Sequence, residues 1–129
     1  MKLTENFSLK EFACHDGSET PNDVIQRLQI VAVQLQKVRD FLGKPININS
    51  GYRSPAHNKS IGGVSNSQHV LGNASDITVK GMSPEEVKQV LEGLIDTGEI
   101  LQGGIGIYNS FVHYDIGYNG KRRRWDNRK

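Results

Sequence analysis

Apolar side chains recur every three or four positions through residues 24–42, which is the spacing of one face of a helix. The stripe consists of Val24, Leu28, Val31, Leu35, Val38 and Leu42. Pro21 stands at its start, and Gly43 and Pro45 follow its end, as the start and stop signals of helices do. The pattern therefore predicts a long amphipathic helix with one buried face.

Two segments of the form Ser-x-x-Glu predict further helices. Ser8-Leu-Lys-Glu11 matches the capping box and predicts a short helix before a turn at Asp16 and Gly17. Ser83-Pro-Glu-Glu86 has an N-cap serine, a proline at the first helical position and a glutamate three residues after the cap. A longer helix is expected there. A fourth helix, which is short, is expected between residues 55 and 62.

Alternation of apolar and polar residues predicts four strands. They cover residues 46–50, 74–79, 103–108 and 111–116. A tight turn joins the last two, which predicts a hairpin. The segment from Val64 to Leu71 is predicted to be a loop.

The order of these elements indicates the fold class. Helices come first and strands are then mixed with helices, so we predict an α+β fold with an antiparallel sheet flanked by helices. The 129 residues contain no internal repeat or linker and are enough to bury one core. We therefore predict a single domain over residues 1–129.

Charge and hydropathy exclude some classes of function. The 16 Lys and Arg against 14 Asp and Glu leave a net charge of +2, which argues against a nucleic-acid partner. The basic residues 121–124 are expected to be a solvated end. No apolar run approaches a membrane span, and no signal-peptide pattern opens the chain. We expect a monomer made in the cytoplasm that reaches any extracellular target by release or by another export route.

Cysteine usage is minimal. Cys14 is the single cysteine, so no disulfide can form within these residues. We expect no cysteine-based metal site either, and interpret Cys14 as a small buried hydrophobic side chain.

Two short segments hold the side chains best suited to catalysis. Residues 67–76 read Ser-Gln-His-Val-Leu-Gly-Asn-Ala-Ser-Asp, and residues 111–115 read Phe-Val-His-Tyr-Asp. Their His69, Asp76 and His113 are a suitable three-ligand set for a catalytic zinc with a fourth position open to water. Asp115 follows His113 by two residues and therefore points from the same face of the strand.

The alternative is that these side chains are structural. His69 would then be a loop histidine, Asp76 a capping residue, and His113 part of a surface ladder. Polar groups facing a sheet interior have to be paired, metal-bound or near water, which favours a functional site.

These segments also carry a family resemblance. Ser67-x-His69-x-x-Gly72-x-Ala74-x-Asp76 resembles the metal motif of the zinc D-alanyl-D-alanine peptidases, whose fold is shared with hedgehog signalling domains. Ser50-Gly-Tyr-Arg-Ser54 resembles the arginine segment that precedes this motif, and Phe111-Val-His-Tyr-Asp115 the third-ligand strand. The opening Phe7-Ser-Leu-x-Glu-Phe12 and the closing Arg-Arg-Trp125 are similar to the small cell-wall and phage-associated members.

The resemblance implies zinc bound by His69, Asp76 and His113. It also implies that Arg53 lies near the substrate, where a guanidinium can hold a carboxylate or stabilise an oxyanion. Ser67 would contact the substrate or shape the loop.

The chain departs from the family pattern at one position. Many relatives carry an acidic or histidine base three residues before the third ligand, where this chain has Ser110. Asp115 is therefore open to three interpretations: the general base, a partner that orients a histidine, or itself a ligand. We favour His113 as the zinc ligand and predict that Asp115 is catalytic, taking the proton from the water and delivering it to the leaving amine.

The function implied by the resemblance is zinc-dependent hydrolysis of peptide bonds in peptidoglycan stem peptides or cross-links. Its substrate partner would be a peptidoglycan peptide. The alternative is a catalytically inactive module of the same fold that binds cell-wall peptide or a protein.

Overall fold

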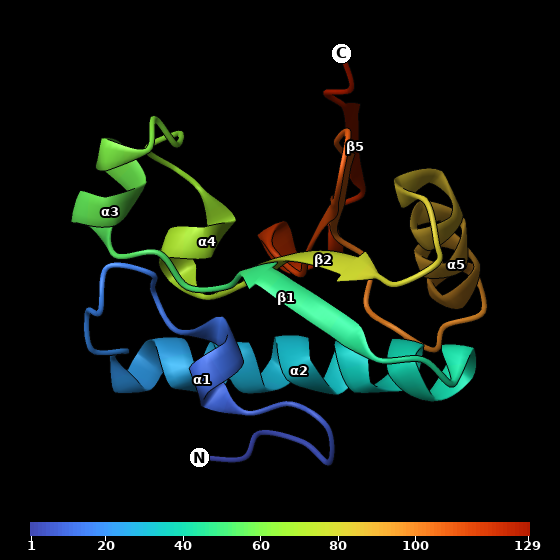
Figure 1. Ribbon diagram of the computed structural model, residues 1–129, viewed down its shortest axis with the longest axis horizontal. Helices are drawn as coiled ribbons and strands as arrows, with labels where there is room; N and C mark the ends of the chain where they lie inside the picture. The colour runs from blue at the N-terminus through green and yellow to red at the C-terminus, as the bar shows by residue number, and fades with distance from the viewer.

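The chain folds as a mixed sheet covered on one face by a long helix. The computed structural model describes residues 1–129, apart from the side chain of Tyr118. Helix α2 (Asn22–Leu42) runs along the underside of the sheet in Figure 1, with α5 (Pro84–Asp96) at one end. The α+β class is as predicted.

The sheet has five strands in the order β1-β2-β4-β3-β5. Their bounds are β1 Ile46–Ser50, β2 Ala74–Val79, β3 Gly104–Ile107, β4 Val112–Asp115 and β5 Arg123–Asp126. The first four pair antiparallel, including the predicted β3–β4 hairpin, but β5 runs parallel to β3.

Strand β5 corrects the expectation of a solvated basic end. Arg124 donates two hydrogen bonds to Glu92 on α5, at 2.9 and 2.7 Å, and Arg123 pairs with the buried Asp115. Arg123 and Arg124 therefore have buried or half-buried acidic partners, whereas Lys121 and Arg122 are exposed. The sequence does not predict this strand because residues 121–124 are all basic and show no alternation of apolar and polar side chains.

The remaining helices are short. They are α1 Leu9–Phe12, α3 Pro55–Ser60 and α4 Gln68–Leu71, with a 3-10 turn at Tyr118–Gly120. Helix α4 occupies the second half of the segment predicted to be a loop, so that prediction was wrong for residues 68–71 and holds for residues 64–67. One helical turn is too short to show a hydrophobic period.

The core lies between α2 and the sheet. The α2 stripe is buried from Val24 to Val38, and it packs in one cluster with sheet residues such as Ile77 and Val112. Because side chains alternate across a strand, the neighbours of Ile77 and Val112 point to the opposite face. Those neighbours are Asp76 and His113, which are paired across β2 and β4.

In the part of the chain described, no helix is both long and apolar enough to cross a membrane.

Candidate metal centre

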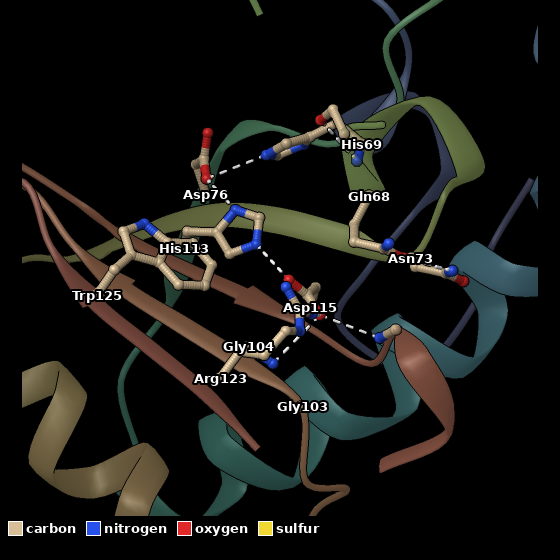
Figure 2. Close-up of polar contacts among 12 residues, drawn as sticks. Gln68, His69, Asn73, Asp76, Gly103, Gly104, His113, Asp115, Arg123 and Trp125 are labelled. Atoms are coloured by element: carbon tan, nitrogen blue, oxygen red, sulfur yellow. Dashed lines mark hydrogen bonds and ion pairs between the residues drawn. The ribbon is translucent and has the colours of Figure 1, made fainter. Parts of the chain in front are cut away.

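Three side chains converge above the sheet on the face opposite α2. Asp76 and His113 lie on neighbouring strands, and His69 reaches them from α4 (Figure 2). The Oδ1 atom of Asp76 lies 3.2 Å from His69 Nε2 and 3.2 Å from His113 Nδ1. One donor atom from each residue lies within 4.8 Å of the others. These are the three residues that the sequence put forward.

The single turn of α4 holds His69 in place. The Ser67 hydroxyl caps the helix by accepting the His69 backbone N–H at 3.2 Å. Gly72 ends it in the left-handed region, at φ 81°. The His69 Nδ1 atom lies 2.7 Å from the carbonyl oxygen of Gly51. A carbonyl can only accept, so Nδ1 carries a proton and Nε2 is the ring nitrogen left to face Asp76.

His113 is oriented in the same way by a carboxylate. Its Nε2 atom lies 2.6 Å from Oδ2 of Asp115, whose side chain is fully buried. The other oxygen of Asp115 accepts the backbone N–H groups of Gly104 at 3.2 Å and Gly117 at 3.0 Å, and also bonds Arg123. With Nε2 donating to a carboxylate, Nδ1 is the ring nitrogen that faces Asp76: it carries a proton in the imidazolium form and offers a lone pair once a metal ion replaces that proton.

The electrostatics favour a cation at this point. Burial opposes ionisation of Asp76, but hydrogen bonds from His113 and His69 hold its pKa well below the usual range. Burial likewise opposes charge on His113, but its bonds to Asp115 and Asp76 raise its pKa overall. Burial also opposes ionisation of Asp115, but the His113 hydrogen bond, the Gly117 N–H and the Arg123 charge together lower its pKa. Two carboxylates that stay ionised thus stabilise positive charge between them.

Arg53 lies at the edge of the same group. Its Nη2 atom is 3.4 Å from Oδ2 of Asp76, and its other nitrogens lie 3.3 Å from Asn58 Oδ1 and 3.4 Å from Ser50 Oγ. Its side chain is only 17% exposed, and its backbone N–H donates to the His69 carbonyl at 3.1 Å. The guanidinium is therefore held beside the converging donors.

These residues line a cavity of about 460 Å³. Ser67 lies in its wall, while Ser110 is exposed and lines a separate small pocket near the start of α5. The aromatic rings of Tyr108 and Phe111 stack with centroids 4.5 Å apart at its rim. A peptide-sized ligand would thus meet polar groups at the centre and rings at the edge.

Sequence reasoning missed two wall residues supplied by β5. The Trp125 ring packs against His113 with centroids 5.0 Å apart, and Arg123 holds Asp115. Room for the indole exists because Gly106 has no side chain: a Cβ there would lie 2.2 Å from the indole nitrogen. In the sequence, the closing Arg-Arg-Trp segment indicated similarity to the small family members, but nothing indicated that it would line the site.

Comparison with known proteins agrees with this geometry. Residues 5–115 match the family described as Peptidase M15, a range that contains all three converging residues but not β5. A 45-residue segment is 47% identical to the zinc D-Ala-D-Ala carboxypeptidase of Streptomyces albus G. That segment is 34% of this chain and spans 18% of the length of that relative. Family and relative both imply zinc as the cofactor, and the match over most of the chain shows that it belongs to the M15 peptidases.

Proposed function

We propose that this protein hydrolyses peptide bonds in peptidoglycan stem peptides or cross-links, with zinc held by His69, Asp76 and His113. The convergence of three potential ligand atoms carries the proposal. One nitrogen of each imidazole lies 3.2 Å from the same Asp76 oxygen, while the other nitrogen of each ring is bonded elsewhere, to Gly51 and to Asp115. Atoms this close need positive charge among them, which ring protons supply in the free protein and a metal ion supplies when bound.

The donor set matches zinc in number and type. Two histidine nitrogens and one carboxylate oxygen leave the fourth tetrahedral position to water, which is the arrangement of catalytic zinc sites. A bound zinc ion acidifies water and polarises a peptide carbonyl. Placing the donors on paired strands and on a capped helical turn keeps them rigid, as such chemistry requires.

Arg53 is proposed to act on the substrate. Its guanidinium faces the cavity beside Asp76 and is held by Asn58 and Ser50. From there it can donate to the carbonyl oxygen as negative charge develops, or hold a substrate carboxylate. Ser67 is proposed mainly to shape the site, because its hydroxyl already accepts the His69 backbone N–H.

Asp115 is proposed to orient His113 and not to serve as the general base. Both of its oxygens have partners, and the side chain is fully buried behind the ring that it bonds. A general base must reach the proton that it abstracts. Of the alternatives that the sequence left open, the orienting role is the one supported by these contacts.

Defined muropeptides provide the test. The zinc-loaded protein should release new amino groups, and mass spectrometry of the products should identify the bond cleaved. Activity should vanish with a chelator, return with added zinc, and be lost in Asp76→Ala. Ser110→Ala is the matched control, since Ser110 is exposed and lies away from the cavity, and should retain activity.

The outcomes separate the two candidate functions. Protein that binds zinc and muropeptide but releases no amine under any condition would be a binding module, and the hydrolase proposal would be wrong. Hydrolysis that survives both chelation and Asp76→Ala would contradict the assignment of the metal centre.

A further inference from the structure

A second group of potential ligands lies outside the cavity. The Sγ of Cys14, a carboxylate oxygen of Asp16 and a ring nitrogen of His57 all lie within 4.8 Å of one another. Cys14 and Asp16 belong to the turn that follows α1, and His57 lies in the first turn of α3. The loop after α1 rises toward the start of α3 in Figure 1, which brings these two segments together.

The group combines burial with access. Cys14 is 5% exposed, His57 is half-buried and Asp16 is exposed. The sulfur thus lies at the inner side of the group and the carboxylate at the outer side.

Ser54 organises two of the three donors. Its backbone N–H donates to the Cys14 sulfur at 3.3 Å, and its hydroxyl donates to Oδ2 of Asp16 at 2.9 Å. The backbone N–H of Ser18 donates to the other oxygen of Asp16 at 2.8 Å. The Cys14 thiol and the Ser18 side chain also hydrogen-bond Asp16, so a metal ion bound here would replace the thiol proton. Hydrogen bonds of this kind orient the ligands of metal sites.

The chemistry of the donors selects the class of ion. A thiolate and an imidazole suit zinc and similar transition metals, whereas calcium and magnesium prefer oxygen ligands alone. We propose that Cys14, Asp16 and His57 form a second transition-metal site, with zinc or a similar ion, whose fourth position is taken by water. This proposal is contrary to the expectation from the sequence that no cysteine-based metal site forms, and the experiment below decides between them.

The proposed site has a structural role. A metal ion there would join the turn after α1 to the first turn of α3. Ser54, which caps α3, directly follows Arg53 in the chain. The ion would restrain the segment that also supplies the Gly51 carbonyl bonded to His69. The site is independent of the proposed hydrolysis, since none of its three donors lines the cavity.

Cobalt substitution tests the proposal directly. Purified protein kept reduced without thiols is loaded with cobalt(II), and its near-ultraviolet thiolate-to-cobalt charge-transfer band is recorded. Metal content per chain is measured in parallel by mass spectrometry of the digested protein. Only the second site contains a cysteine, so the band reports on it alone.

Four variants give the expected pattern. Wild type should bind two ions per chain and show the band, while Cys14→Ser and His57→Ala should each bind one and lack it. His15→Phe is the matched control: it removes an imidazole of the same turn but keeps a ring against His57, whose centroid lies 6.2 Å away, and it should keep both ions. Asp76→Ala should lose the other ion and keep the band, which separates failure of this site from failure of the catalytic one.

Stability provides a second measurement. In Asp76→Ala, zinc should still raise the Tm through the second site, because a ligand stabilises the state that binds it. Adding Cys14→Ser or His57→Ala to that variant should abolish the remaining rise. Circular dichroism checks that each variant folds. A wild type that binds one ion and shows no charge-transfer band, or a band unchanged in His57→Ala, would overturn the proposal and leave the three side chains as a hydrogen-bond network.

Discussion

A single carboxylate, Asp115, determines which nitrogen of His113 faces the centre of the site. It has no exposed surface and satisfies two backbone N–H groups as well as the imidazole and Arg123. Outer partners of this kind are usually worth a factor of about 10–100 in metal affinity. Asp115 can therefore matter for catalysis without touching the substrate.

Asp115→Asn should weaken zinc binding more than it weakens chemistry. An amide keeps the shape of the side chain but removes the charge that holds the His113 N–H, so zinc affinity should fall by about 10–100-fold. The measurement is zinc affinity by competition with a chelating dye, together with hydrolysis over a range of zinc concentrations. Activity should recover substantially at excess zinc.

The contrary result is also informative. Normal zinc affinity combined with activity that no zinc concentration restores would show that Asp115 is the general base. Asp96→Asn, an exposed change at the end of α5, is the control and should alter neither quantity.

Arg53 should contribute to the transition state and little to zinc binding. Arg53→Lys keeps the charge but loses the planar fork, so we expect kcat to fall about 100-fold or more with zinc content unchanged. Steady-state kinetics on a defined muropeptide measure this loss. An unchanged kcat would exclude the role, and Arg122→Lys at an exposed arginine serves as the control.

At the scale of the element, α4 is one turn long and depends on its two ends. Ser67 caps its start, and Gly72 at φ 81° allows the chain to turn back into β2. A Cβ on Gly72 would lie 2.7 Å from a Val24 methyl carbon and 3.1 Å from the Val24 carbonyl. The position of His69 is thus connected to the packing of α2.

Gly72→Ala should therefore displace α4 as well as strain the backbone. We expect a loss of unfolding free energy of about 2–4 kcal/mol, together with weaker zinc binding. Urea unfolding and the dye competition measure the two effects. Gly98→Ala has a similar φ of 78° with nothing within 4 Å of its Cβ, so it should cost only about 1 kcal/mol and leave zinc affinity unchanged. Equal effects in both variants would mean that the contact with Val24 is unimportant.

At the scale of the whole molecule, the ion pair between Glu92 and Arg124 joins α5 to the last strand of the sheet. Both guanidinium contacts are short, at 2.9 and 2.7 Å, and the two side chains are mostly buried. The Arg124 hydrogen bonds lower the pKa of Glu92 below its usual 4.5, and Arg122 and Lys88 add to the effect. Folding therefore favours the ionised form of this carboxyl.

The sign of the pH dependence follows from that shift. Stabilisation by Glu92 is complete above the pKa of the unfolded chain and is lost as the pH falls through the lower folded pKa. As the pH falls from about 6 to about 3, the free energy of unfolding of Glu92→Gln should therefore decrease less than that of wild type. The difference should be on the order of 1 kcal/mol. Urea titrations at both pH values measure the difference. Parallel losses in the two proteins would contradict it, and exposed Glu99→Gln should behave as wild type.

Some elements of the fold and the candidate ligands could be predicted from the sequence, and two elements could not. The apolar stripe of α2, the two capping boxes and the β3–β4 hairpin were predictable because their signals are local in the chain. The three candidate ligands were predictable because their residue types and order are unusual together. Helix α4 and strand β5 were not, since one turn has no period and a basic strand pairs through partners distant in sequence.

By itself the sequence determined the class of fold, the buried face of α2 and the residues that could bind zinc. Only the tertiary structure decided which histidine nitrogens face Asp76, that Asp115 lies behind His113, and that Trp125 forms a wall of the cavity. It also brought Cys14 and Asp16 to His57, a juxtaposition with no trace in their spacing. Helix and turn signals act over a few residues, whereas proton positions and ligand groups depend on contacts between segments that the chain holds far apart.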